Sequence, residues 1–573
     1  MQLTLTWRLG GLSGEGVDAA GDVMARTVAR SGFHLYTYRE FSTQIRGGYT
    51  SYEVSMGPRP VIARSDDLDF LVALTRETVE RSLVDLTRDA VLIHDSSGFE
   101  LPEELPSGIR VYPLPLRERA QEIGAAIVKN TIALGASAYL IGIPLQNLKG
   151  SIMDTFKGKA EEVIGQNLTA ADEGWNIAQK NMFVGLRSLG TIVERPKLLM
   201  SGDEAVSLGA LTAGCRFFAG YPITPASPIL EWLASHLPEF GGVVIQAEDE
   251  ISALGYAVGA GYAGARSMTA TSGPGLSLMV EMIGLAGMSE TPVVIVDVQR
   301  VGPSTGLPTK HEQGDIDLAT HASHGDPNHV VLTAGTVQDC YHRTALAFNV
   351  AERYQCPVIL LIDMALGIGK QTVDSLSAEH VEIDRGQLLQ GGDVPGGFMR
   401  YRIRDSGISS RFIPGTAEAT LIASSVEHDE TGLYSEDPEN RVRMTEKRLR
   451  KMETIRREIA HLKVFGDDEA GVSLVGIGSV KGSLLHTLER MSEDGFNARY
   501  VDIPCLLPFP REEMNRIVAS SDKVLVVEQN STGQLFRYIR SHIEASGELK
   551  SITKFDGTPF RPNELYQLLR EEI

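Results

Sequence analysis

The chain has 573 residues, which is too long for one ordinary domain and predicts three or four domains of about 100–200 residues each. Hydrophobic residues make up 42% and charged residues 22%, a balance typical of soluble globular proteins that excludes a largely disordered, collagen-like or disulfide-scaffold protein. The 54 Lys and Arg residues against 74 Asp and Glu residues give a formal charge of −20. Because such a surface repels phosphates and anionic lipids, nucleic acid and membrane are not expected partners.

The four cysteines are scattered, and none belongs to a Cys-x-x-Cys motif: Cys215, Cys340, Cys356 and Cys505. The spacing therefore predicts no zinc ribbon, redox dithiol or iron–sulfur ligand set within this chain. The first residues alternate apolar and polar side chains like a strand and do not resemble a secretory signal. No apolar stretch reaches the ~18 residues of a membrane span, so we expect a cytoplasmic protein.

The pattern of strands and helices predicts an α/β fold throughout, with three domains and one connector. The predicted boundaries are 1–195 for the first domain, 196–366 for the second, 367–465 for the connector and 466–573 for the third. In the first domain the expected elements are a strand at 3–9, a helix at 17–31, strands at 33–38 and 91–95, and apolar runs at 125–134 and 136–143, interpreted as a helix and its neighbour.

The second domain alternates strands and helices so regularly that a parallel sheet is expected. Its predicted strands are 216–221, 243–248, 267–272, 292–300, 330–332 and 357–363. Ligands bind at the carboxyl ends of strands in such sheets. The connector should be irregular over 367–440 and helical over 444–462, where we interpret the basic run 447–451 as a solvated face rather than an anion site. The third domain is predicted to be a smaller doubly wound sheet.

A glycine loop follows the first strand, and its Gly14 and Gly16 match the spacing of a nucleotide-binding turn. Glu40 lies about 20 residues further on, where a dinucleotide site has its ribose-binding acid, so NAD is one interpretation. Glu15 and Asp18 place negative charge beside the expected phosphate, and a plain strand-to-helix turn is the alternative. Arg46 and Gly47 add a guanidinium and a glycine suited to phosphate or carboxylate, or a surface arginine beside a turn.

The second domain carries more specific motifs at its predicted strand ends. In GYPITP (220–225) Thr224 either binds a small carboxylate near helix amides or only caps the helix. In QAEDE (246–250) three carboxylates follow a strand, and a buried one is a candidate acid/base, although acids also pair with helix N-termini. TATSGPG (269–275) is a further turn with hydroxyls, and Arg300 begins a Gly/Pro-rich loop of the kind that is often functional.

Together these motifs resemble the alpha subunit of the 2-oxoacid:ferredoxin oxidoreductases, of the 2-oxoglutarate type. The resemblance covers nearly the whole chain. The segments that carry it are GYPITP, AEDEISALGYAVGAGYAGARSMTATSGPG, VQRVGPSTGLPTKHEQGD, PCLLPFP, VVEQNSTGQL, KFDGTPFRPNEL and the connector EHDETGLYSEDPENRVRMTEKRLRKM. The first domain is similar to that family's gamma domain, fused ahead of a thiamine diphosphate pyrimidine-binding domain and a transketolase C-terminal-like domain.

The resemblance implies thiamine diphosphate chemistry, in which a carboxylate hydrogen-bonds the aminopyrimidine and the cofactor accepts electrons from the 2-oxoacid. We place this carboxylate at Glu250, with Glu248 as the alternative. Thr224 and Arg300 would hold the reacting end of the substrate, and Lys310 the distal carboxylate of 2-oxoglutarate. The remaining cofactor assignments are Tyr221, Pro222 and Ser272 for thiamine diphosphate, and Gly14, Gly16, Arg46 and Gly47 for coenzyme A, the acyl acceptor.

The family resemblance also implies a partner, because the chain has no GDG motif for Mg²⁺ and diphosphate and no cluster cysteines. A beta subunit would bring the diphosphate-binding domain, Mg²⁺ and a [4Fe–4S] cluster that passes electrons to ferredoxin, in an (alpha-beta)2 heterotetramer. Alone, the chain should be inactive. The alternatives are the same chemistry on pyruvate or other 2-oxoacids, an NAD-dependent dehydrogenase that uses the N-terminal loop, and a non-catalytic assembly subunit.

Overall fold

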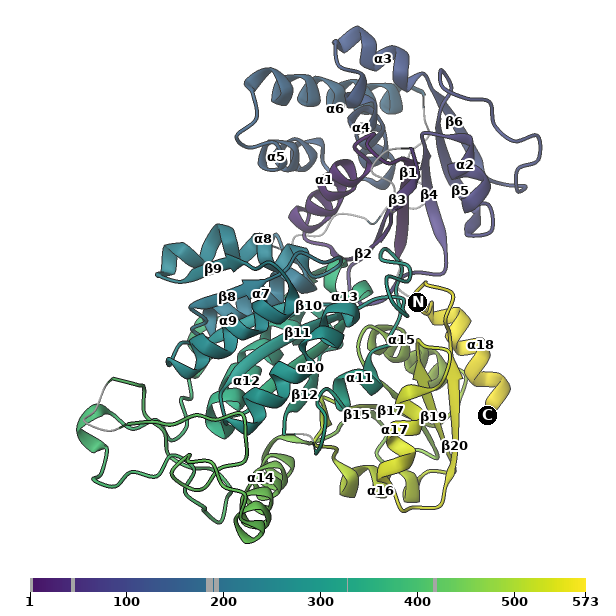
Figure 1. Cartoon of the computed structure of the whole chain (residues 1–573). Coiled ribbons are helices and arrows are strands. Elements are labelled where there is room, and N and C mark those ends of the chain that lie inside the picture. The colour runs from purple at the N-terminus through teal and green to yellow at the C-terminus, as the bar shows by residue number, and fades with distance from the viewer. Residues whose placement is uncertain (1–3, 43–46, 182–188, 190–194, 327, 416–419) are drawn as a thin grey trace. The chain divides into compact units, whose positions relative to one another are not determined.

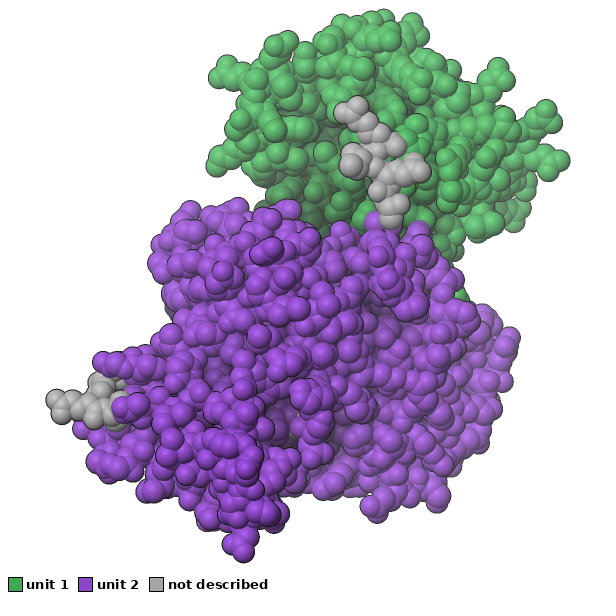
Figure 2. Space-filling view, viewed as in Figure 1, with its two compact units in different colours: residues 1–200, 369–376, 561–564 green, residues 201–368, 377–560, 565–573 purple. Residues whose placement is uncertain are grey.

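The computed structural model describes residues 4–42, 47–181, 189, 195–326, 328–415 and 420–573 (Figure 1). Its secondary structure forms three sheets with many helices, which confirms the predicted α/β class. By compactness the chain divides into two units, coloured separately in Figure 2. Unit 1 comprises residues 1–200, 369–376 and 561–564, and unit 2 comprises residues 201–368, 377–560 and 565–573.

Unit 1 is built on an eight-stranded sheet of order β6-β5-β4-β1-β3-β2-β14-β7. Strands β1, β4, β5 and β6 are mutually parallel, whereas β3 runs antiparallel to both β1 and β2. The strands are β1 (Leu5–Leu12), β2 (His34–Glu40), β3 (Tyr49–Gly57), β4 (Leu68–Ala73), β5 (Leu86–Asp95), β6 (Arg110–Leu114), β7 (Leu198–Ser201) and β14 (Lys370–Val373). The helices are α1 (Val17–Arg30), α2 (Arg76–Ser82), α3 (Leu116–Ile123), η1 (Ala126–Val128), α4 (Lys129–Ile141), α5 (Leu145–Thr155) and α6 (Glu161–Asn181).

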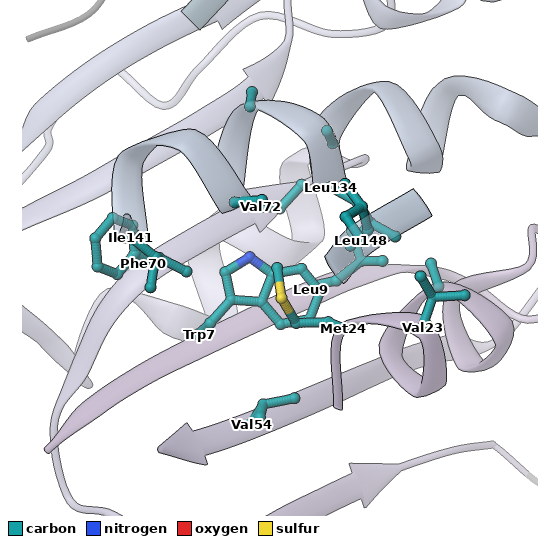
Figure 3. Packing of buried hydrophobic residues seen from close by; sticks show 14 of the residues in the cluster. Trp7, Leu9, Val23, Met24, Val54, Phe70, Val72, Leu134, Ile141 and Leu148 are labelled. Atoms are coloured by element: carbon teal, nitrogen blue, oxygen red, sulfur yellow. The ribbon is translucent and has the colours of Figure 1, made fainter. Parts of the chain in front are cut away.

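The core of unit 1 is packed around Trp7, which is fully buried and donates its indole N–H to Ser137 Oγ at 3.0 Å (Figure 3). The apolar runs at 125–134 and 136–143 were expected to be a helix and its neighbour, but α4 runs through both. Gly135 lies inside α4, where a Cβ would come within 2.3 Å of the Ala171 carbonyl oxygen on α6. This glycine therefore permits close contact between two helices instead of ending one.

Unit 2 contains a seven-stranded sheet of order β18-β12-β13-β11-β10-β8-β9, parallel except for β18. A five-stranded sheet of order β15-β17-β16-β19-β20 follows, with β15 antiparallel to its neighbour. The strands are β8 (Phe217–Gly220), β9 (Val243–Gln246), β10 (Ser267–Thr271), β11 (Val293–Gln299), β12 (Val330–Thr333), β13 (Pro357–Asp363), β15 (Lys463–Gly466), β16 (Val472–Gly476), β17 (Ala498–Asp502), β18 (Cys505–Leu507), β19 (Lys523–Glu528) and β20 (Glu548–Thr553).

The remaining helices of the chain lie between residues 202 and 572. They are α7 (Gly202–Thr212), α8 (Ser227–His236), η2 (Leu237–Phe240), α9 (Glu250–Tyr262), α10 (Gly273–Met288), α11 (Ile316–Thr320), α12 (Val337–Tyr354), α13 (Met364–Ile368), η3 (Ala378–His380), η4 (Gly391–Asp393), α14 (Pro438–Ile459), α15 (Val480–Glu493), α16 (Arg511–Ser520), α17 (Gln534–His542) and α18 (Pro562–Glu572). One apolar cluster runs from Leu254 and Ile283 to Val501 and Leu535. The two sheets thus share a core, and the separate domain boundaries read from the sequence stay a prediction.

The connector helix α14 differs from the expected solvated helix. Lys447 and Lys451 are fully buried, and both donate to the buried carboxylate of Glu290, from Lys451 at 3.0 Å. Burial alone would raise the pKa of Glu290, but the two lysines outweigh it and hold that pKa well below its ordinary value. The interpretation of residues 447–451 as a solvated face was therefore wrong on this side of the helix, while Leu449 remains half exposed.

We expect Glu290→Gln to lower the free energy of unfolding by about 3–5 kcal/mol, because it leaves two buried lysine charges without a counter-charge. Chemical denaturation at pH 7 measures this loss. The matched control is Glu446→Gln, which removes an exposed carboxylate 3.6 Å from Arg450 on the same helix and should cost under about 1 kcal/mol. Equal effects of the two substitutions would contradict a stabilising role for the buried charges.

Candidate functional site at the carboxyl edge of the parallel sheet

Four predicted site segments meet at one edge of the seven-stranded sheet. Strands β8, β9, β10 and β11 are parallel to their neighbours, so their carboxyl ends lie along the same edge. The residues that follow them are Tyr221 to Thr224 after β8, Glu248 to Glu250 after β9, Ser272 after β10 and Arg300 after β11. Tyr221, Pro222 and Thr224 are exposed there, whereas Ser272 and Arg300 are buried.

The three carboxylates of QAEDE separate into three environments. Glu248 is exposed. Asp249 caps α9 by accepting a hydrogen bond from the Ser252 amide at 2.7 Å, and this bond lowers the pKa of Asp249. Glu250, the first residue of the helix, is buried, and no hydrogen-bond partner of its carboxylate is found among the described residues. Only Glu250 thus combines burial with an uncommitted carboxylate.

Space around Glu250 depends on Gly275 in the first turn of α10. A Cβ at Gly275 would lie 2.0 Å from Thr271 Oγ1 and 2.7 Å from Glu250 Cγ, so only glycine fits without a shift of one of them. Ser272 is the N-cap of α10, yet its side chain caps nothing. Its buried Oγ has no hydrogen-bond partner within the described part of the chain. A buried hydroxyl of this kind is costly unless something else binds it.

Arg300 is held by main-chain oxygens. Its Nη1 donates to the Thr224 carbonyl oxygen at 2.5 Å and its Nη2 to that of Thr305 at 3.4 Å, while Nε is buried without a partner in the described chain. Helix α8 begins only at Ser227 after the N-cap Ala226. The alternative in which Thr224 simply caps this helix is therefore wrong, and Thr224 contacts Arg300 through its carbonyl group.

Two acids at this edge were not predicted. Asp297 is fully buried in β11, and neither of its oxygens has a partner in the described part of the chain. Asp315 precedes α11, and burial raises its pKa to about 7, helped by Glu312 and opposed by Arg300. The one signal for Asp297 was a single acid inside the apolar run PVVIVDVQR. Asp315 ends the motif VQRVGPSTGLPTKHEQGD, but no role was assigned to it there.

Lys310 lies in a loop that main-chain hydrogen bonds hold at Lys310 and at the residue after it. The Val301 amide donates to the Lys310 carbonyl oxygen at 3.1 Å, and the His311 amide to that of Gly557 at 3.1 Å. The His311 ring contacts Gln529 Oε1 through Nε2 at 2.8 Å. Residues from the C-terminal sheet segment therefore hold the Arg300–Asp315 loop, a set of contacts that no local pattern could reveal.

In unit 1 the two predicted glycine segments, around Gly14 and Gly47, are hydrogen-bonded to each other. Gly14 and Gly16 have φ of 91° and 79°, values that favour glycine. The Ser13 amide donates to Gly48 at 2.7 Å and the Gly47 amide to Ser13 at 3.3 Å. Arg46 lies outside the described residues.

The acids of this loop are compensated by basic side chains. Lys129 Nζ binds Glu15 at 2.9 Å, and Arg39 binds Asp18 at 2.9 Å. The dinucleotide interpretation does not fit the sheet, because β3 lies between β1 and β2. Glu40 is thereby about two strand spacings, ~9–10 Å, from the line of β1, whereas a ribose-binding acid follows the adjacent strand.

We expect Gly275→Ala to destabilise the protein by about 1–3 kcal/mol through overpacking against Thr271 and Glu250. Gly259→Ala is the matched control, because Gly259 is an exposed residue of α9 and a Cβ there meets nothing within 4 Å. Alanine at such a position stabilises a helix by about 0.5–1 kcal/mol relative to glycine. Thermal unfolding of both variants measures the difference. A Gly275→Ala protein as stable as Gly259→Ala would show that this space is not restricted.

Searches of the described residues find no helix long and apolar enough to cross a membrane and no cluster of three metal-ligating side chains. Three family models match: the thiamine diphosphate-binding domain of pyruvate flavodoxin/ferredoxin oxidoreductases over residues 208–447, pyruvate ferredoxin/flavodoxin oxidoreductase over 6–177, and the pyruvate:ferredoxin oxidoreductase core domain II over 470–565.

Individual relatives cover between 64% and 100% of the chain. A 2-oxoacid:ferredoxin oxidoreductase subunit alpha of Sulfolobus is 30% identical, over 100% of this chain and 97% of its own length. A 2-oxoglutarate synthase subunit KorA of Methanothermobacter marburgensis is 37% identical over 64% of this chain and 96% of its own length. The solved 2-oxoglutarate:ferredoxin oxidoreductase of Magnetococcus marinus, with 2-oxoglutarate, coenzyme A and succinyl-CoA bound, is 37% identical over all of both chains, with a TM-score of 0.94.

Proposed function

Because this chain belongs to the 2-oxoacid:ferredoxin oxidoreductase family, we propose that it supplies the pyrimidine-binding half of a thiamine diphosphate site and the residues that bind 2-oxoglutarate. The reaction would be oxidative decarboxylation to succinyl-CoA and CO2, with electrons passed to ferredoxin. The observation that carries the proposal is Glu250, the one buried acid of QAEDE, with an uncommitted carboxylate at the carboxyl edge of a parallel sheet.

The residues at this edge fit the pyrimidine end of thiamine diphosphate. An aminopyrimidine needs a carboxylate as hydrogen-bond partner, which Glu250 offers, and the unpartnered Ser272 hydroxyl adds a second polar group. Tyr221 and Pro222 are exposed at the end of β8, where they can contact the ring. When bound, thiamine diphosphate would supply the electron sink for decarboxylation. The role of Glu250 is to accept a hydrogen bond and hold a proton at its carboxylate.

Arg300, Thr224 and Lys310 would bind the substrate. Burial lowers the pKa of Arg300, yet a guanidinium stays charged near neutrality. Its free Nε and its position beside the Thr224 main chain suit the carboxylate next to the 2-oxo group. Lys310, on the anchored loop, would pair with the second carboxylate of 2-oxoglutarate.

A partner subunit completes this proposal. Relatives named subunit alpha imply further subunits, and the chain's own four cysteines are all buried and separate. We assign the diphosphate-binding domain, Mg²⁺ and a [4Fe–4S] cluster to a beta subunit in an (alpha-beta)2 assembly. Coenzyme A would contact unit 1 at Gly14, Gly16, Arg46 and Gly47. The hydrogen-bonded glycine segments support this location, and the coenzyme A bound in the Magnetococcus structure supports the choice of co-substrate.

We expect Glu250→Gln to lower turnover by about 10²–10⁴-fold in the complex with the partner subunit, because an amide cannot hold the proton. Ferredoxin reduction dependent on 2-oxoacid and coenzyme A measures it. Glu248→Gln is the control, since that side chain is exposed and should leave turnover near wild type. Full activity of Glu250→Gln would favour Glu248, or a non-catalytic role for this chain.

We expect 2-oxoglutarate to have a higher kcat/KM than pyruvate, and Lys310→Gln to narrow this preference. A charged hydrogen bond is worth about 1.5–3 kcal/mol, so kcat/KM for 2-oxoglutarate should fall about 10–100-fold while that for pyruvate stays unchanged. Equal or better use of pyruvate by the wild type would refute the substrate assignment.

Titration of the chain with NADH, followed by fluorescence, should show no binding, in contrast to a dehydrogenase.

A further inference from the structure

Two acids at this edge of the sheet, Asp297 and Asp315, have buried carboxyl oxygens without a partner in the described chain and no role in the proposed reaction. The Asp315 amide donates to Gln299 Oε1 at 3.1 Å, which fixes Asp315 next to the end of β11. Its carboxyl group lies against the start of α10, where a Cβ on Gly273 would come within 2.4 Å of Oδ1. Oδ2 of Asp315 and both oxygens of Asp297 are buried without a partner in the described chain.

The charged groups that face Asp315 are few. β11 contributes Asp297, the loop that follows it contributes Arg300 and Glu312, and the first turn of α10 has no charged side chain but offers the Gly273 amide. On α11, Asp317 is exposed and pairs with Arg537. Arg300 is thus the one base, among the described residues, whose charge acts on Asp315, and Asp315 in turn is the acid that acts on Arg300.

Burial disfavours a charge on either acid. Asp315 further raises the pKa of Asp297, and Glu312 further raises the pKa of Asp315. Since the pKa of Asp315 is raised to about 7, its carboxyl is neutral below that pH and ionised above it. Below pH 7 the charge of Arg300 is available to an anion. Above pH 7 the Asp315 carboxylate competes for Arg300 and repels a bound carboxylate.

We propose that Asp315 is a positioning residue that sets how strongly Arg300 attracts the 2-oxoacid, so that substrate binding weakens as the pH rises through neutrality. This inference rests on the proposed function, in which Arg300 binds the substrate carboxylate. The substrate carboxylates are ionised throughout this range, so they add no pH dependence of their own.

The test is KM and kcat for 2-oxoglutarate from pH 6 to 8.5 in the complex with the partner subunit. We expect the wild-type KM to rise by up to about tenfold per pH unit above neutrality, with a smaller change in kcat. Asp315→Asn should make KM independent of pH. Asp317→Asn, two residues on and exposed, should keep the wild-type profile.

Glu312→Gln provides a second readout, which also serves if Asp315→Asn does not fold. Removal of the Glu312 charge lowers the pKa of Asp315, so the rise in KM should begin at lower pH. An unchanged pH profile in Asp315→Asn, or in Glu312→Gln, overturns the inference. Arg300→Lys tests the proposed function separately from this inference. If the KM of Arg300→Lys at pH 6.5 is unchanged, the substrate role of Arg300 is refuted. If that KM is raised while Asp315→Asn keeps the wild-type pH profile, only the role of Asp315 is refuted.

Discussion

Parallel pairing of β8, β9, β10 and β11 is the constraint from which the candidate site follows. Hydrogen bonding between neighbouring parallel strands aligns their directions, so every strand-to-helix turn opens at the same edge. Segments that lie up to about eighty residues apart in the chain, from Tyr221 to Arg300, are therefore neighbours without any direct bond between most of them. The site chemistry depends on which side chains then point inward. After β9 this follows from helix capping: the Asp249 side chain binds the first turn of α9, and the next residue, Glu250, is buried.

The loop after β11 needs a second constraint, because it has little regular structure. Its conformation is fixed by hydrogen bonds between buried polar groups. Gln313 Nε2 donates to Asp363 Oδ2 at 2.9 Å, and Asp363 Oδ2 also accepts the Ser479 amide at 2.7 Å. Asn530 donates to the Gln313 carbonyl oxygen at 3.2 Å. The five-stranded sheet thus contributes to the site through the loop that it anchors, although none of its side chains was assigned a role.

Much of the fold was predictable because buried strands leave a clear mark in sequence. The runs at 292–300 and 357–363 are apolar and β-branched, and they became β11 and β13 with bounds shifted by a residue or less. The errors arose where partners are distant in the chain. Lys447 looks solvated in sequence because Glu290, its counter-charge, lies 157 residues away. Gly135 looks like a break because the α6 backbone that requires it is invisible from α4 alone.

Because the net charge of the protein is −20, an anion site on it needs locally positive surroundings. Burial of the acids near the site contributes to this. Asp297 and Asp315 would each add a negative charge to this edge of the sheet if they were exposed, and Asp315 acts directly on Arg300. Removal from water favours the neutral form of both, so the immediate surroundings of the guanidinium are less acidic than the composition suggests. Within the described part of the chain, the hydrogen-bond partners of Arg300 are uncharged carbonyl oxygens. Its charge is therefore not neutralised by an ion pair, which is the condition under which a buried arginine can bind an anionic substrate.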